Sequence, residues 1–122
     1  MTQINELLDF LRESVTPFHA VRGMCKRLEQ AGFESVERFD PSAMVPGHGY
    51  FMTKQGSSLV ALRAGVQELG RGLRLVGAHT DSPNLSVKPN PVTGRDGCVQ
   101  LAVDIYGGAL LNPWFDRDLA LA

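Results

Sequence analysis

The stretch of sequence that decides the fold is Leu73-Arg74-Leu75-Val76-Gly77-Ala78-His79-Thr80-Asp81. A short apolar run is followed there by His79 and Asp81, two residue types that commonly occur in metal sites. Residues 73–78 predict a buried strand. Side chains alternate along extended chain, so His79 and Asp81 fall on one side of the backbone just after that strand. Such pairs occur in metal sites, where the neutral imidazole is a ligand and the carboxylate a second ligand, an orienting partner or a proton acceptor.

A structural role for the same pair stays open on spacing alone. His79 would then cap the strand end, and Asp81 would accept N–H bonds from the turn at Ser82-Pro83. A hydrolytic metal site usually takes three protein ligands per metal, and a two-metal site also needs a bridging carboxylate. The whole chain has only three histidines.

Two amphipathic helices are expected upstream of this stretch. Apolar residues at helical spacing predict the first helix over about residues 3–14, with Thr2 as a possible N-cap. Thr16-Pro17 is a typical helix start, and Gly32 is a typical residue after a helix end. The apolar residues at helical spacing are Ile4, Leu7, Leu8, Leu11 and Val15 in the first helix, and Val21, Met24, Cys25 and Leu28 in the second.

Strands are expected after the helices. Residues 33–49 have poor periodicity and predict a loop, whereas 50–53 and 59–63 predict a hairpin joined by 54–57. Residues 64–72 contain several glycines and predict a surface turn before the strand at 73–78. The order indicates an α/β layer in which the helix pair covers one face of a mixed sheet. Ligands bind at the carboxyl ends of strands in open α/β sheets, which is where His79 falls.

The rest of the chain predicts a second region. Residues 85–88 alternate like a strand, Pro89 to Gly94 should break it, and positions near 89–91 are a candidate domain boundary. Residues 98–106 predict another strand, closed by Gly107-Gly108. The last residues are apolar and carry no helix cap, so we expect the natural polypeptide to continue.

Composition narrows the function classes. The 122 residues are 43% hydrophobic, enough for one modest core, and the net charge of -1 comes without the basic stripe that nucleic-acid binding needs. No apolar run approaches the roughly 20 residues that cross a bilayer. The N-terminus lacks a signal-peptide pattern, and Cys25 and Cys98 lack metal-site spacing, so a cytoplasmic protein with reduced thiols is expected.

Other chemistry-bearing residues favour structural roles. His19 lies in the first turn of the second helix and His48 in a Pro/Gly loop, where a metal role would require the loop to fold back on the sheet. The segment Trp114 to Asp118 is more typical of a binding surface, an oligomer contact or a buried ion pair. The sequence has no G-x-S-x-G elbow, and no P-loop arrangement follows Gly107-Gly108.

Three segments, in order, resemble the aspartyl aminopeptidases, the M18 family of metallopeptidases. They are residues 14–20 (SVTPFHA), residues 76–83 (VGAHTDSP) followed by Leu85, Val87 and Lys88, and residues 106–108 (YGG) with 114–119 (WFDRDL). The resemblance runs over essentially the whole chain, in register with the N-terminal part of such enzymes.

The resemblance implies a cytoplasmic exopeptidase that removes N-terminal Asp or Glu from peptides with two divalent ions, usually Zn2+. It implies that His79 is a metal ligand and that Asp81 is the catalytic-site carboxylate behind it, which orients the ring and raises its basicity. A metal-bound water would attack the peptide carbonyl. Family members assemble as homo-oligomers, namely dodecamers, and nothing implies a nucleic-acid or membrane partner.

The implied fold is the N-terminal part of an α/β/α zinc-peptidase domain, residues 1–88, followed by the start of an inserted β-rich dimerisation domain, residues 89–122, both incomplete. The bridging aspartate, the glutamate pair and the last histidine of the family lie further downstream. The chain is therefore expected to be truncated and inactive alone. The alternative is a non-enzymatic relative that acts as an interaction module through the region of Trp114.

Overall fold

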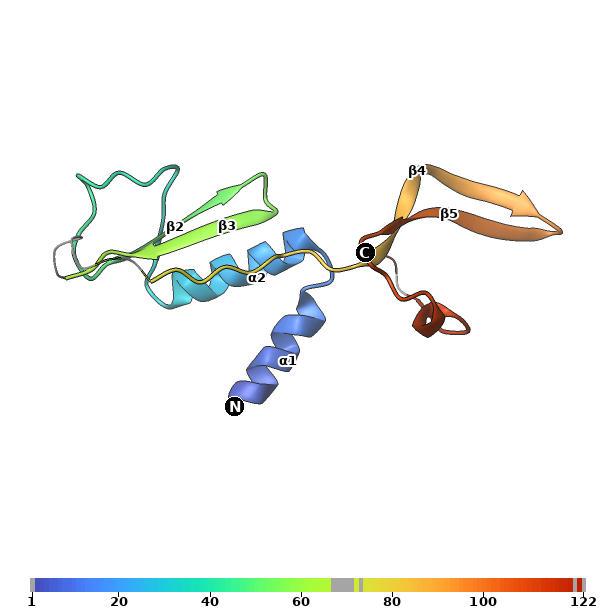
Figure 1. Ribbon diagram of the computed structural model, residues 1–122, viewed down its shortest axis with the longest axis horizontal. Helices are drawn as coiled ribbons and strands as arrows, with labels where there is room; N and C mark the ends of the chain where they lie inside the picture. Colours follow the sequence, from blue (N-terminus) through green and yellow to red (C-terminus); the bar gives the residue numbers. More distant parts are fainter. Residues whose placement is uncertain (1, 67–71, 73, 120, 122) are drawn as a thin grey trace. The chain divides into compact units, whose positions relative to one another are not determined.

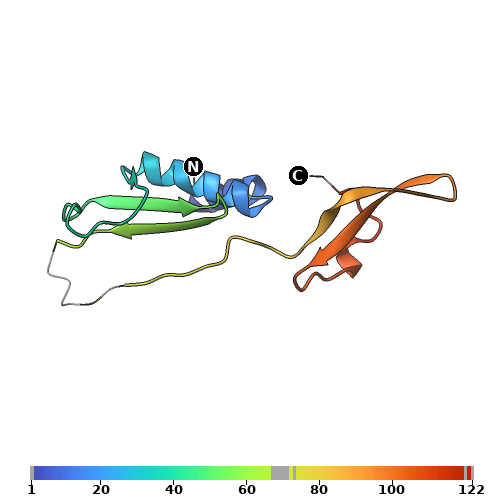
Figure 2. The same cartoon turned by 90° about the horizontal axis from the view of Figure 1, so that it is seen from above.

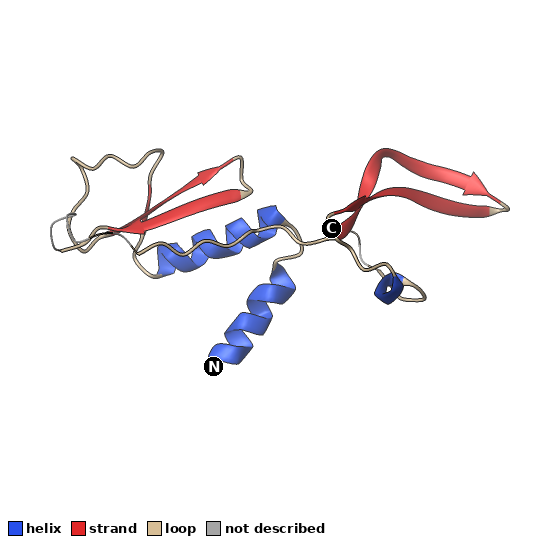
Figure 3. Cartoon of the chain, viewed as in Figure 1, coloured by secondary structure: helices blue, strands red, loops and turns tan. Residues whose placement is uncertain are grey.

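The computed structural model describes residues 2–66, 72, 74–119 and 121 (Figure 1). The chain divides into two compact units, Met1–Asp81 and Ser82–Ala122. The first unit holds helices and a sheet, and the second holds a hairpin and a short 3-10 helix (Figure 3). The two units divide between Asp81 and Ser82, ahead of the candidate domain boundary near residues 89–91, and residues 89–91 lie inside a strand.

Both helices form where the sequence predicts them. Helix α1 spans Gln3–Glu13, with Thr2 at the N-cap position but without a capping bond from its side chain. Helix α2 spans Pro17–Gln30, and the Thr16 hydroxyl accepts a hydrogen bond from the backbone of His19. At its end, the N–H of Gly32 donates to Glu29 and that of Phe33 donates to Leu28, while Gly32 has φ 78°. This is the Schellman motif, which needs a left-handed residue at that position.

The sheet of the first unit has the order β1-β2-β3. Strand β2, Gly49–Lys54, and strand β3, Ser58–Arg63, form the predicted antiparallel hairpin. Strand β1, Glu34–Ser35, pairs parallel to β2 and makes the sheet mixed, as expected. Strand β1 is not predicted from the sequence, because two residues are too few to show a period.

Helix α2 covers the sheet. It contacts all three strands, whereas α1 contacts α2 but no strand among the described residues, so the prediction that both helices cover the sheet holds for α2 alone (Figures 1 and 2). The buried hydrophobic residues are Ala20 and Val21 of α2 with Tyr50 and Phe51 of β2. The apolar stripe of α1 stays exposed, with Ile4 at 70%.

The prediction of a strand at residues 73–78 is wrong for residues 74–78, the part of that range that the structure describes. Residues 74–79 belong to no helix or strand, and Leu75 and Val76 are 94% and 95% exposed. Alternating apolar residues indicate a tendency to be buried, but a strand also needs a neighbour to pair with, and no strand in the described ranges pairs with this segment. Residues 67–71 of the predicted turn, and residue 73, lie outside the described residues.

The second unit is built on a hairpin of β4, Asn84–Arg95, and β5, Cys98–Tyr106. The strand at 98–106 is confirmed, but the prolines do not end the earlier strand as expected. The pairing shifts between Val87 and Val92, so residues 88–91 stand opposite Ala102 as a bulge. A bulge tolerates proline because its residues leave the hydrogen-bond ladder.

The hairpin of β4 and β5 is amphipathic. Residues opposite each other in an antiparallel pair share a face, and the apolar pairs are Leu85 with Ile105, Val87 with Val103, and Val92 with Leu101. Pairs on the other face are polar, such as Ser86 with Asp104. Lys88 also forms a 2.9 Å ion pair with Asp104. The register of the hairpin therefore follows from its hydrophobic pattern.

Candidate functional site

His79 and Asp81 do lie together, near the end of the first unit. Nδ1 of His79 is 2.8 Å from the backbone oxygen of Asp81 and 3.3 Å from its carboxylate Oδ1. The His79 side chain is 81% exposed and that of Asp81 is 41% exposed. The sequence expectation that the two residues face the same side is met, although the segment before them is not a strand.

The contacts of Nδ1 determine which ring nitrogen has a lone pair for a ligand. Two oxygens of Asp81 are within reach of Nδ1, and an oxygen acceptor favours the tautomer that carries the proton on that nitrogen. The lone pair of the neutral ring is then on Nε2. A carboxylate or carbonyl behind a histidine is the usual means of fixing the ring orientation of a metal ligand. The pair therefore has the chemistry of one metal ligand with its support.

A second contact near this pair was not anticipated from the sequence. The hydroxyl of Thr80 donates a 2.8 Å hydrogen bond to the backbone oxygen of Ser57 in the turn between β2 and β3. It ties the His79 segment to the sheet, across 23 positions of sequence. The position of Thr80 between His79 and Asp81 was the one feature of the sequence that could have indicated this bond. Its acceptor is a backbone oxygen, which no sequence pattern identifies.

A complete metal centre is not assembled by the described residues. No three His, Cys, Asp or Glu side chains among them come close enough to hold an ion. A zinc site usually needs three protein ligands, so the residues fit a single ligand position and not a whole site.

The other two histidines have contacts with neighbouring side chains. Nδ1 of His19 is 2.7 Å from the hydroxyl of Thr16 at the start of α2. His48 lies directly before the first residue of β2. Its Nε2 is 3.7 Å from a carboxylate oxygen of Glu34, and the centroid of its ring is 5.0 Å from that of the Tyr50 ring. Neither residue has a contact with His79 in the described structure that would support a metal role.

The aromatic segment of the second unit forms a hollow. Asn112–Trp114 is a 3-10 helix, and Arg117 donates a 3.2 Å hydrogen bond to the backbone oxygen of Pro113. A hollow of about 330 Å³ lies beside Trp114, Arg117 and Leu119, while Phe115 is 64% exposed. An exposed aromatic residue beside charged side chains is typical of an interface or binding surface.

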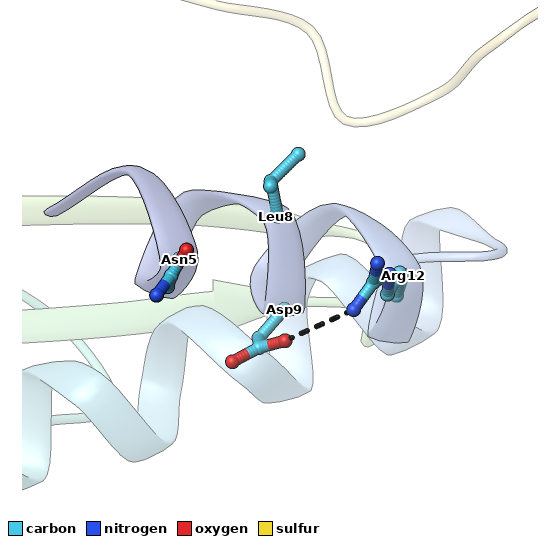
Figure 4. A pocket seen from close by; sticks show the side chains of 4 residues that line it. All are labelled: Asn5, Leu8, Asp9 and Arg12. Atoms are coloured by element: carbon cyan, nitrogen blue, oxygen red, sulfur yellow. Dashed lines mark ion pairs between the residues drawn. The ribbon is translucent and has the colours of Figure 1, made fainter. Parts of the chain in front are cut away.

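Another hollow lies on α1 and is not connected with the site pair. It measures about 290 Å³ and is lined by residues of this single helix, as Figure 4 shows: Asn5, Leu8, Asp9 and Arg12. Asp9 and Arg12 form a 3.5 Å ion pair across one helical turn, with both side chains more than half exposed. Exposed pairs of this kind add little stability, and we assign this hollow no catalytic role.

Sequence comparison assigns the family. The family model "Aminopeptidase I zinc metalloprotease (M18)" matches residues 10–122. The chain therefore belongs to the M18 family of peptidases. Its helices and sheets agree with the α/β class that we expected. Among the described residues, no helix is both long and apolar enough to cross a lipid bilayer.

Individual relatives support the same assignment. "Probable M18 family aminopeptidase 2" of Pseudomonas putida is 54% identical over 117 residues, which are 95% of this chain and 27% of the relative. The structure of mApe1 from Chaetomium thermophilum is 36% identical with a TM-score of 0.84, covering 93% of this chain and 26% of that chain. The S. cerevisiae mApe1 dodecamer is 26% identical with a TM-score of 0.80, covering 93% and 27%. The chain thus spans about a quarter of the length of these proteins.

Proposed function

We propose that residues 1–122 are a part of a metallo-aminopeptidase in which His79 is a metal ligand and Asp81 is the carboxylate that supports it. The observation that carries the proposal is the contact of Nδ1 of His79 with the backbone oxygen and the carboxylate Oδ1 of Asp81, within the stretch that the family model matches. The bound metal, usually zinc, would polarise the peptide carbonyl and lower the pKa of a water. Asp81 would fix the tautomer and the ring orientation of His79.

The finer functional features belong to the same proposal. We expect hydrolysis of N-terminal Asp or Glu from peptides, two metal ions per site and a cytoplasmic location. The neighbour described as a dodecamer supports a homo-oligomer. We assign residues 1–88 to the peptidase domain and 89–122 to the beginning of a β-rich dimerisation domain. In support of a separate second part, the compact unit Ser82–Ala122 has its own hairpin.

The 122-residue polypeptide should not hydrolyse peptides by itself. A hydrolytic zinc needs about three protein ligands, and the described residues bring no further ligands to His79. The purified chain is therefore expected to leave Asp- and Glu-p-nitroanilide intact with or without added Zn2+. Cleavage that needs metal and stops with a chelator would contradict this part of the proposal.

A chimera tests the ligand role. Residues 1–122 replace the matching part of the Pseudomonas putida relative, and the chimera is assayed for zinc content and for hydrolysis of Asp-, Glu- and Leu-p-nitroanilide. His79→Ala should abolish turnover and reduce bound zinc, and Asp81→Asn should cost roughly 10- to 100-fold in metal affinity or activity. The matched control is His48→Ala, which removes a histidine with structural contacts only.

Three results would refute separate parts of the proposal. Normal turnover and zinc content in the His79→Ala chimera would exclude the ligand role. An Asp81→Asn chimera that behaves like the parent would exclude the supporting role. A preference for the Leu substrate would exclude the acidic specificity and leave the metal role standing.

A further inference from the structure

We propose that Thr80 is a positioning residue that holds the His79 segment on the turn between β2 and β3. The inference rests on the proposed function, since it concerns the placement of the ligand His79. Its direct observation is the 2.8 Å hydrogen bond from Oγ1 of Thr80 to the backbone oxygen of Ser57.

Among the described residues, the segment before Thr80 makes few other contacts with the first unit. Residues 74–79 lie outside helices and strands, and the side chains of Leu75 and Val76 are almost fully exposed. Gly77 has no atom within 4 Å of the place where a Cβ would be. Thr80 itself is partly buried. The bond to Ser57 is therefore a polar contact that joins this segment to the sheet.

The acceptor, in contrast, belongs to a well-defined turn. Lys54 pairs with Ser58 at the end of the hairpin, and the N–H of Ser57 donates to the backbone oxygen of Lys54 at 3.3 Å. Gln55 and Gly56 have φ values of 54° and 69°, the left-handed conformation that closes such turns. The hairpin therefore fixes the position of the backbone oxygen of Ser57.

The same turn also meets the start of α2. A Cβ on Gly56 would be 3.5 Å from the ring of Phe18, which lies in the first turn of α2. Residues 14–20 and 76–83 are two of the segments on which the family resemblance rests, and they are far apart in the sequence. Phe18 of the first segment and Thr80 of the second both lie against this turn. The turn therefore links the helix start to the candidate ligand.

The position of Thr80 between His79 and Asp81 gives the bond its effect on the site. Fixing residue 80 limits the motion of the residue on each side, and the contact between His79 and Asp81 is made by those two residues. Ligand groups must be held close to the productive geometry by contacts of this supporting kind. The Thr80 hydroxyl consequently determines where Nε2 of His79 lies with respect to the sheet.

The experiment compares Thr80→Val, which keeps the shape but removes the hydroxyl, with Thr80→Ser, which keeps the hydroxyl. Backbone 15N relaxation is measured on the metal-free 122-residue chain. Order parameters at residues 78–81 should fall from about 0.85 toward 0.6 or below in Thr80→Val and should be retained in Thr80→Ser. The control Thr93→Val removes a threonine hydroxyl that bonds the backbone oxygen of Gln100, in the other unit, and should leave residues 78–81 unchanged.

A second readout connects the bond with the metal. In the chimera, zinc loss to a chelator should be about tenfold faster or more with Thr80→Val, and Thr80→Ser should restore the parental rate. Unchanged order at residues 78–81 in Thr80→Val, with the β2–β3 amide signals intact, would overturn the inference, and so would an unchanged rate of zinc loss. The relaxation measurement needs neither metal nor activity, so failure of the ligand role in His79→Ala is recognised separately.

Discussion

The hydroxyl oxygen of Thr16 lies 2.7 Å from Nδ1 of His19 and 3.4 Å from the backbone nitrogen of the same residue. The backbone N–H donates to this oxygen, which satisfies one of the free donors in the first turn of α2. Because α2 contacts all three strands of the sheet, the start of this helix matters for the stability of the whole first unit.

Thr16→Ala should therefore destabilise the first unit. Loss of an N-cap side chain costs about 1 kcal/mol, and we expect this decrease in the free energy of unfolding, measured by urea denaturation followed by circular dichroism. Thr16→Ser keeps the hydroxyl and should lose much less. Equal losses in the two variants would show that the methyl group, and not the capping bond, is responsible.

A side chain at Gly49, the first residue of β2, should destabilise the first unit. A Cβ there would be 2.6 Å from Cδ1 of Phe33, and the guanidinium of Arg63 lies over the same ring at 5.1 Å from its centroid. The ring is held between its neighbours, so Gly49→Ala should cost about 1–3 kcal/mol by overpacking.

Gly77→Ala is the matched control for that variant. No atom lies within 4 Å of a Cβ at Gly77, so its free energy of unfolding should stay within about 0.5 kcal/mol of the parent. Thermal or urea unfolding of both variants makes the comparison. A Gly49→Ala protein as stable as Gly77→Ala would contradict the contact with Phe33.

The sequence predicts well what depends on neighbouring residues. Thr16-Pro17 and Gly32 mark the ends of α2, and the hairpin of β2 and β3 follows from two apolar runs separated by a glycine turn. It predicts poorly what depends on a distant partner. The run at residues 74–78 looks like a strand, but its tendency to be buried does not provide a neighbour for pairing.

The same difference between local and distant contacts applies to the candidate site. The His79 and Asp81 contact joins residues two positions apart, and alternation along the chain predicts only that the two residues lie on one side of the backbone. The bond from Thr80 to Ser57 depends on how the hairpin is placed and could not be read from the sequence. In β4, the prolines indicated a break, but the pairing of Val92 with Leu101 resumes after the bulge because both strands keep their apolar face.

The pKa of Asp40 should lie below its ordinary value of 3.8. Hydrogen bonds from the side chain and the backbone N–H of Ser42, at 2.6 and 3.0 Å, stabilise its carboxylate and lower its pKa from the ordinary 3.8. A lowered pKa in the folded state means that the stabilisation is full above the ordinary pKa and is lost as the pH falls through the folded-state pKa. The loss of this stabilisation is therefore confined to acid conditions, below about pH 4.

Ser42→Ala tests the cause of this shift. It removes the 2.6 Å bond and leaves the backbone bond, so the pKa of Asp40 should rise part of the way toward 3.8 in an NMR titration of the carboxyl carbon. Ser58→Ala, at the start of β3, is the control and should not alter the titration of Asp40. An unchanged midpoint in Ser42→Ala would show that the hydroxyl bond does not persist in solution.

Cys25 should react slowly with alkylating reagents. Burial in α2 raises the pKa of its thiol, and the carboxylate of Glu29, one helical turn further on, raises it again because a nearby negative charge opposes the thiolate. A raised pKa leaves less thiolate at pH 8, whereas Cys98 is exposed and should be alkylated first. Glu29→Gln removes the charge and keeps the shape, so it should speed the reaction of Cys25 with iodoacetamide about twofold, as expected for one charge pair at this helical spacing. Peptide mass spectrometry measures the rate, with Glu13→Gln on α1 as the control. A rate that is unchanged or slower in Glu29→Gln would leave burial as the sole cause of the raised pKa.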